Sequence, residues 1–253
     1  MTNWKEKDYV VLEFSTIGDL WFRDAKRRFM QFERESIIEV AAVKIEKGAI
    51  TKHYTSFVGI EDFDANDYDF GDFNLNAKGI TNLHLIGAPK FERVCDELHK
   101  FTRDCVLAVG TLSDSPYDDF VIFKESAMNY GYVFNQPVIS INDLLFAAEL
   151  RDRVGDKTFN LEEMTLPEIT AFFKRKKAWG ELLAERDIYI FDEETLELKG
   201  NKLTYALAHA QLLISLINEE EEREEESFQK IEREEYKACR KDCPLDECPF
   251  DED

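Results

Sequence analysis

The sequence is short of positive charge. Its 253 residues include 32 Lys and Arg against 53 Asp and Glu, which gives a formal net charge of −21. A surface this acidic repels a phosphate backbone at long range unless a local basic groove or bound metal ions compensate. The composition therefore argues against a protein that binds nucleic acid by overall charge.

Long apolar runs and an export signal are also missing. No stretch approaches the roughly 20 apolar residues needed to cross a bilayer, and the first residues, Met1 to Asp8, are charged rather than signal-like. The five cysteines are an odd number in a chain without a signal, and reduced thiols are their simplest interpretation. We therefore expect a cytoplasmic protein with no membrane partner.

Glycine and proline are few, at 11 and 6 residues, while hydrophobic residues make up 44% and include 20 Phe. This composition can bury a large core and excludes wholesale disorder. The length predicts one domain, residues 1–218, followed by an acidic C-terminal extension, residues 219–253. The extension has 16 acidic and 6 basic residues, so it is expected to be solvated, whether helical or flexible.

Strand and helix patterns alternate along the body of the chain. Short apolar or alternating runs predict strands at Asp8–Phe14, Ile37–Glu46, Ile50–Val58, Val106–Val109 and Val138–Ile141. Helical spacing predicts helices that begin near Pro89 and that cover Asp118–Tyr130, Asp143–Leu150 and Lys202–Ile217. A hairpin followed by strands separated by helices indicates an α/β fold with a mixed sheet.

Five stretches resemble, in order, the motifs of one nuclease family. They are Val10–Gly18, Ile37–Val58, Gly79-Ile80-Thr81 with Ala88-Pro89-Lys90-Phe91, Ser115-Pro116-Tyr117-Asp118, and Lys202–Ala210. The family is the DEDD-type 3′-to-5′ exonucleases, the DnaQ-like or RNase T-like branch of the ribonuclease H-like fold. The resemblance implies a mixed five-stranded sheet with helices on both faces, followed here by the acidic extension.

The resemblance also implies a two-metal chemistry. Two divalent cations roughly 4 Å apart activate water and stabilise the leaving oxygen of a phosphodiester. Mg²⁺ and Mn²⁺ prefer oxygen ligands, so carboxylates from distant motifs must converge. In the family, four acidic residues hold these ions and a histidine shortly before the last acid is the general base. Glu13 matches the first acid, and Asp118 or its neighbour Asp119 matches the third.

The remaining positions of the family's site are substituted. Ser15 replaces the second acid, Thr204 replaces the histidine, and His209 replaces the last acid. A hydroxyl is a poor Mg²⁺ ligand beside a carboxylate, so a pair of cations loses charge that it needs. In a site of this kind Glu13 is expected to pair with His209, while Ser15 and Thr204 fill space.

Three functions follow from these substitutions. The leading hypothesis is a degenerate family member, impaired or inactive in catalysis and without a metal, which acts by binding a protein or nucleic-acid partner. The alternative is an active, Mg²⁺- or Mn²⁺-dependent exonuclease with a rewired site that uses Glu13, Asp118 or Asp119, and His209. The third is an acidic interaction module that docks a basic partner. Whether the chain is an enzyme is therefore open at this point.

Overall fold

A computed structural model describes residues 6–17, 22–23, 29–30, 36–59, 82–85, 87–110, 118–154, 183–188 and 202–242. The strands are β1 (Tyr9–Ile17), β2 (Phe22–Arg23), β3 (Phe29–Met30), β4 (Ser36–Glu46), β5 (Ala49–Phe57), β6 (Val106–Val109) and β7 (Val138–Ser140). The helices are α1 (Asn82–Leu85), α2 (Phe91–Phe101), α3 (Asp119–Asn129), α4 (Ile141–Val154) and α7 (Lys202–Asp242).

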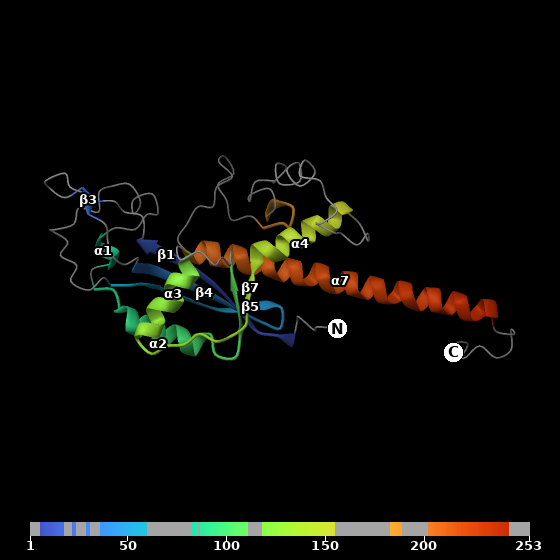
Figure 1. Cartoon of the computed structure of the whole chain (residues 1–253), viewed down its shortest axis with the longest axis horizontal. Coiled ribbons are helices and arrows are strands. Elements are labelled where there is room, and N and C mark those ends of the chain that lie inside the picture. Colours follow the sequence, from blue (N-terminus) through green and yellow to red (C-terminus); the bar gives the residue numbers. More distant parts are fainter. Residues whose placement is uncertain are drawn as a thin grey trace.

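The main sheet has five strands in the order β5-β4-β1-β6-β7, and β2 and β3 form a separate pair. β1 pairs antiparallel with β4 and parallel with β6, while β5 is antiparallel to β4 and β7 is parallel to β6. Helices α4 and α7 pack on one face of this sheet, and α2 and α3 pack on the other (Figure 1). The predicted α/β fold with a mixed five-stranded sheet is confirmed.

The central strand β1 is buried on both faces, which explains its nearly unbroken apolar sequence. Tyr9 and Val11 belong to the core beneath α4 and α7, whereas Val10 and Leu12 belong to the core beneath α2 and α3. Successive side chains of a strand point to opposite faces, so a strand that is covered on both sides needs apolar residues at consecutive positions. Glu13 interrupts this pattern on the α7 face.

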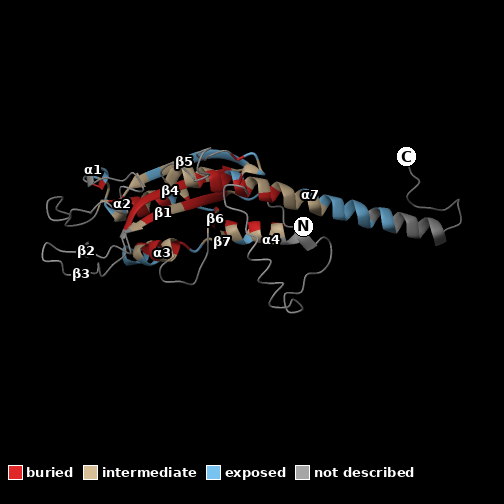
Figure 2. Ribbon diagram, turned by 90° about the horizontal axis from the view of Figure 1, so that it is seen from above, coloured by how far each residue is buried: buried red, intermediate tan, exposed pale blue. Residues whose placement is uncertain are grey.

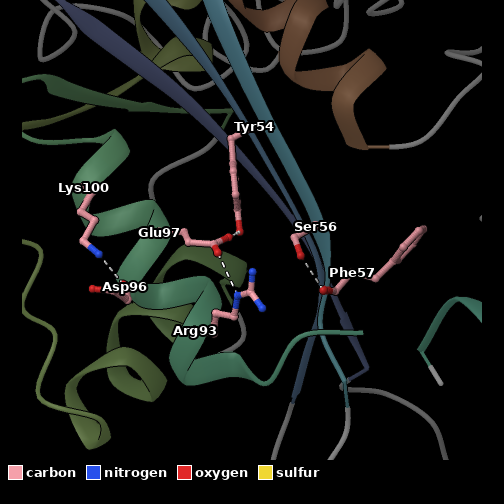
Figure 3. Close-up of polar contacts among 7 residues, drawn as sticks. All are labelled: Tyr54, Ser56, Phe57, Arg93, Asp96, Glu97 and Lys100. Atoms are coloured by element: carbon pink, nitrogen blue, oxygen red, sulfur yellow. Dashed lines mark hydrogen bonds and ion pairs between the residues drawn. The ribbon is translucent and has the colours of Figure 1, made fainter. Parts of the chain in front are cut away.

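Helix α2 is attached to the edge strand β5 by polar contacts and by aromatic packing. Tyr54 Oη donates to Glu97 Oε2 at 3.1 Å, and Arg93 Nε donates to Glu97 Oε1 at 2.9 Å (Figure 3). The rings of Tyr54 and Phe101 lie 6.1 Å apart between their centroids. Burial, together with the Glu97 carboxylate, raises the pKa of Tyr54 to about 12, so its hydroxyl remains a donor at neutral pH.

Helix α7 is longer than the sequence pattern predicts. The helix predicted over Lys202–Ile217 continues as one 41-residue helix to Asp242, so the acidic extension, which was expected to be helical or flexible, begins as part of α7. Its first half packs against β1, β4, β5 and α4, whereas residues 225–231, 233 and 234 are exposed (Figure 2). Glutamate is a good helix former, and Arg186 donates to both carboxylate oxygens of Glu219, at 2.9 and 3.3 Å.

The other predicted elements agree with the structure apart from shifts of a few residues at their ends. The β4–β5 hairpin turns at Lys47 and Gly48, both of which have a positive φ. The motif segments Gly79–Thr81 and Ser115–Tyr117, and the extension beyond residue 242, lie outside the described residues. Among the helices that are described, none combines the length and the apolar character required to cross a bilayer.

Candidate functional site

A cleft of about 360 Å³ opens where the pairing of β1 with β6 ends. The last pair of residues in register is Leu12 with Val109, so Glu13 and Gly110 are the first residues beyond it. In open α/β sheets, ligands bind outside the carboxyl ends of the strands. The cleft is lined by Leu12, Glu13, Phe14, Val109, Gly110, Asp118, Asp119, Phe120, Asn142 and His209.

Glu13 is largely enclosed, with 12% of its side chain exposed. His209 Nδ1 lies 2.6 Å from Glu13 Oε1, and Lys202 Nζ lies 3.4 Å from Glu13 Oε2. Burial alone would raise the pKa of Glu13, but the contacts with His209 and Lys202 outweigh it and hold this pKa below its ordinary value. Glu13 is therefore a carboxylate at neutral pH with a partner on each oxygen.

Gly110 leaves room for the His209 ring. A Cβ atom at position 110 would lie 3.0 Å from His209 Cε1 and 3.4 Å from Glu13 Oε1. The carbonyl of Gly110 accepts a hydrogen bond of 3.0 Å from the backbone N–H of Asn142, the second residue of α4. The turn after β6 is thus fixed to α4, and a side chain at position 110 would press on the histidine.

Ser15 is buried beside the cleft and takes part in a different contact. Its hydroxyl donates to Glu39 Oε2 at 3.3 Å, and Glu39 Oε1 accepts the backbone N–H of Lys202 at 3.1 Å. Ser15 is 1% exposed and Glu39 is 2% exposed. The strand residue that matches the second acid of the nuclease family therefore supports a carboxylate that caps the first turn of α7.

Asp118 and Asp119 both line the cleft, but each has a local partner. Asp118 is the N-cap of α3, and its Oδ1 accepts the backbone N–H groups of Phe120 at 2.9 Å and Val121 at 3.3 Å. A cap of this kind contributes about 1 kcal/mol to stability. Asp119 Oδ1 accepts the Thr16 hydroxyl of β1 at 2.7 Å. Asp118 thus caps α3, and Asp119 connects α3 to the central strand β1.

The structure brings four of the six sequence-predicted site residues together. Glu13, Asp118, Asp119 and His209 line one cleft. The other two, Ser15 and Thr204, are not among the lining residues: Ser15 faces Glu39, and Thr204 lies half-buried in the first turn of α7.

Sequence reasoning missed Lys202, although its spacing contained a signal. Lys202 precedes His209 by seven residues, which is two helical turns, so both side chains lie on the same face of α7. A histidine proposed to face Glu13 therefore implies that Lys202 faces β1 as well, and the structure places both within contact of Glu13. Gly110 and Asn142 were not predicted either, because nothing in their local pattern marks them.

A metal site of protein ligands is not assembled in the described part of the chain. No three His, Cys, Asp or Glu side chains among those residues lie close enough together to hold an ion. In the cleft, the two oxygens of Glu13 face His209 and Lys202, and one oxygen of Asp118 is used by the helix cap.

Sequence comparison finds distant bacterial relatives. The DNA polymerase III PolC-type of Streptococcus thermophilus is 27% identical over 150 residues, which are 58% of this chain and 8% of the polymerase. The polymerases of two further strains of this organism match to the same extent. The chain therefore spans a small fraction of the length of these relatives. No protein-family model matches the sequence.

Two solved structures of a 3′-exonuclease have a similar fold. The full-length enzyme aligns with a TM-score of 0.51 and 12% identity, over 85% of this chain and 83% of that chain. A structure of a 3′-exonuclease that recognises the 3′ end of a histone mRNA stem-loop gives the same values. The order of strands, the helices on both faces and these likenesses agree. The chain has the same fold as these 3′-exonucleases.

Proposed function

We propose that this chain is a binding protein built on the 3′-exonuclease fold, and that its cleft does not perform two-metal hydrolysis. The observation that supports this is the environment of Glu13, whose two carboxylate oxygens face His209 and Lys202. At the position of the family's first metal-binding acid, the carboxylate is thus engaged by side chains of the protein itself. The Glu13 carboxylate therefore acts as one partner of a structural ion pair.

The donor set does not fit a pair of Mg²⁺ ions. Two-metal hydrolysis needs several carboxylates with free oxygens directed at one point. Here Ser15 and His209 supply a hydroxyl and an imidazole where the family has acids, and Lys202 adds a positive charge 3.4 Å from Glu13. Each of these changes lowers the negative potential that would attract a divalent cation.

The charge of the chain favours a basic protein as the partner over a nucleic acid. The formal net charge is −21, and helix α7 has exposed glutamates beyond its last core residue, Ile217, among them Glu222, Glu225 and Glu226. Such a surface repels phosphate backbones and attracts a complementary basic surface by long-range electrostatics. Binding to a nucleic acid is the competing outcome of the experiments below.

The first prediction concerns hydrolysis. We expect the full chain to leave 3′-labelled single-stranded DNA and RNA intact with millimolar Mg²⁺ or Mn²⁺, because the cleft lacks the ligands for two cations. Gel electrophoresis of the labelled strands measures shortening directly. Glu13→Gln serves as the control for contaminating nucleases, since trace activity that persists in this variant does not come from the cleft.

One observation favours a second candidate function. Glu13, Asp118, Asp119 and His209 do line the same cleft, which is the set that a rewired exonuclease would use. The same assay separates the two functions, because shortening that requires Mn²⁺ and disappears in Glu13→Gln would establish a working nuclease and reject the binding protein.

The second prediction concerns the basic partner. A fluorescent lysine-rich polypeptide should bind the full chain, and the affinity should fall at least about tenfold between about 0.05 and 0.3 M NaCl because salt screens exposed charges. Replacing Glu222, Glu225 and Glu226 by glutamine should weaken binding at low salt. The measurement is fluorescence anisotropy.

A matched triple variant controls for the loss of three negative charges. Glu92, Asp104 and Glu125 are also exposed but lie on the body of the protein, and their amide variants should weaken binding less than the α7 variants do. Equal losses of affinity in the two triple variants would show a non-specific effect of net charge. Tighter binding to a single-stranded oligonucleotide than to the polypeptide would favour a nucleic-acid partner instead.

A further inference from the structure

We propose that Lys202 is a built-in cation, which occupies at Glu13 the place that a divalent metal ion would need. The inference deepens the proposed function and rests on it, because it names the residue that keeps the cleft free of metal. It concerns a residue that was not among the predicted site residues, and it makes metal binding in the cleft depend on one side chain.

Lys202 is held in place at two points. Its backbone N–H donates to Glu39 Oε1 at 3.1 Å, and its Nζ lies 3.4 Å from Glu13 Oε2. Glu39 is itself fixed by the hydroxyl of Ser15 at 3.3 Å. The first residue of α7 is thus bound to β1 through its side chain and to β4 through its main chain, so the root of the lysine side chain is fixed close to Glu13.

The surroundings suit an ammonium group. The side chains of Lys202 and Glu13 are 21% and 12% exposed, so the charges are largely removed from water and attract each other more strongly than a surface pair would. Lys202 Nζ also lies 5.5 Å from the centre of the Tyr205 ring, a distance that allows a cation–π contact. These partners replace part of the hydration that the ammonium loses.

The second carboxylate oxygen of Glu13 also has a partner within the protein. His209 Nδ1 lies 2.6 Å from Oε1, and the backbone at Gly110 leaves little free space behind the ring. A divalent ion at Glu13 would therefore have to displace the ammonium or accept its repulsion at close range. With an uncharged side chain at position 202, Glu13 and His209 would remain as two adjacent donors that Mn²⁺ accepts, and water would complete its coordination.

The test is to titrate MnCl₂ alone into three full-length proteins by isothermal calorimetry. The wild type should take up no Mn²⁺ at the cleft at millimolar metal. Lys202→Met removes the charge and keeps the length of the side chain, and it should bind Mn²⁺ more tightly than the wild type by about tenfold or more. Lys202→Arg keeps the charge and should behave like the wild type.

Two further variants make the result specific. Lys100→Met removes a lysine that is 64% exposed, pairs with Asp96 on α2 and does not line the cleft, and it should not bind Mn²⁺. The tighter Mn²⁺ binding of Lys202→Met should disappear when Glu13→Gln is added to it. If Lys202→Met does not fold, as judged by circular dichroism, Lys202→Gln replaces it in the same titration.

The outcomes distinguish this inference from the proposed function. Equal uptake by wild type and Lys202→Met, or no uptake by either, would overturn the role of Lys202 and leave the binding protein in place. Shortening of a labelled strand by the wild type would overturn the proposed function. Uptake that appears only when the charge at position 202 is removed supports the inference.

Discussion

Ser15→Asp is expected to destabilise the fold by about 3–5 kcal/mol, although it restores an acid at a position where the nuclease family has one. Ser15 is 1% exposed, and its hydroxyl donates to the carboxylate of Glu39, which is 2% exposed. An aspartate would replace this donor by a second buried carboxylate within contact distance of the first. Like charges at this separation repel, and burial adds a desolvation penalty.

Urea unfolding at pH 7 measures this loss, and Ser15→Asn separates charge from size. Asparagine has the shape of aspartate but can still donate to Glu39, so we expect it to cost much less than the acid. A midpoint for Ser15→Asp equal to that of the asparagine variant would show that the charge at position 15 is accommodated. In that case the substitution of the family's second acid would need another explanation.

Most of the fold could be predicted because each local signal agrees with the tertiary structure. Val10 to Leu12 are consecutive apolar residues because β1 is covered on both faces. The Lys47-Gly48 turn fixes the β4–β5 hairpin, and α3 begins where Asp118 caps it. These signals act over a few residues, which is the range that a sequence pattern reports.

The length of α7 was predicted less well, for a physical reason. Its apolar face ends near Ile217, and amphipathic spacing detects only the part of a helix that packs on a core. The glutamate run beyond it has high helix propensity but gives no periodic signal. Helical spacing therefore located the packed half of α7, and the sequence left its exposed continuation open between a helical and a flexible extension.

The sequence predicted which residues line the candidate site, but it did not predict the contacts that those residues make. Glu13 and His209 could be aligned with a family motif, because motif positions are properties of the sequence. The contact of Lys202 with Glu13 and that of Ser15 with Glu39 arise from the docking of α7 on β1 and β4. Such contacts decide whether a carboxylate is available to a metal, and they form only in the folded chain.

Glu13→Gln is expected to destabilise the protein by about 3 kcal/mol at neutral pH, because it leaves Lys202 and His209 beside an amide in place of a carboxylate. The loss should depend on pH in a defined direction. The folded-state pKa of Glu13 lies below its ordinary value of 4.5, so its ionised form stabilises the fold fully above that value. The stabilisation is lost as the pH falls through the lower folded-state pKa.

Urea unfolding of wild type and Glu13→Gln from neutral pH to about pH 3 tests this dependence. The wild type should exceed Glu13→Gln in free energy of unfolding by the whole amount above the ordinary pKa. Below that pKa this difference should decrease, because the wild-type carboxyl becomes protonated and then resembles the amide. Glu125→Gln is a suitable control, since Glu125 is exposed on α3 and should matter little at any pH. A difference that stays constant down to pH 3 would mean that Glu13 acts through shape, and that its charge does not hold α7 to the sheet.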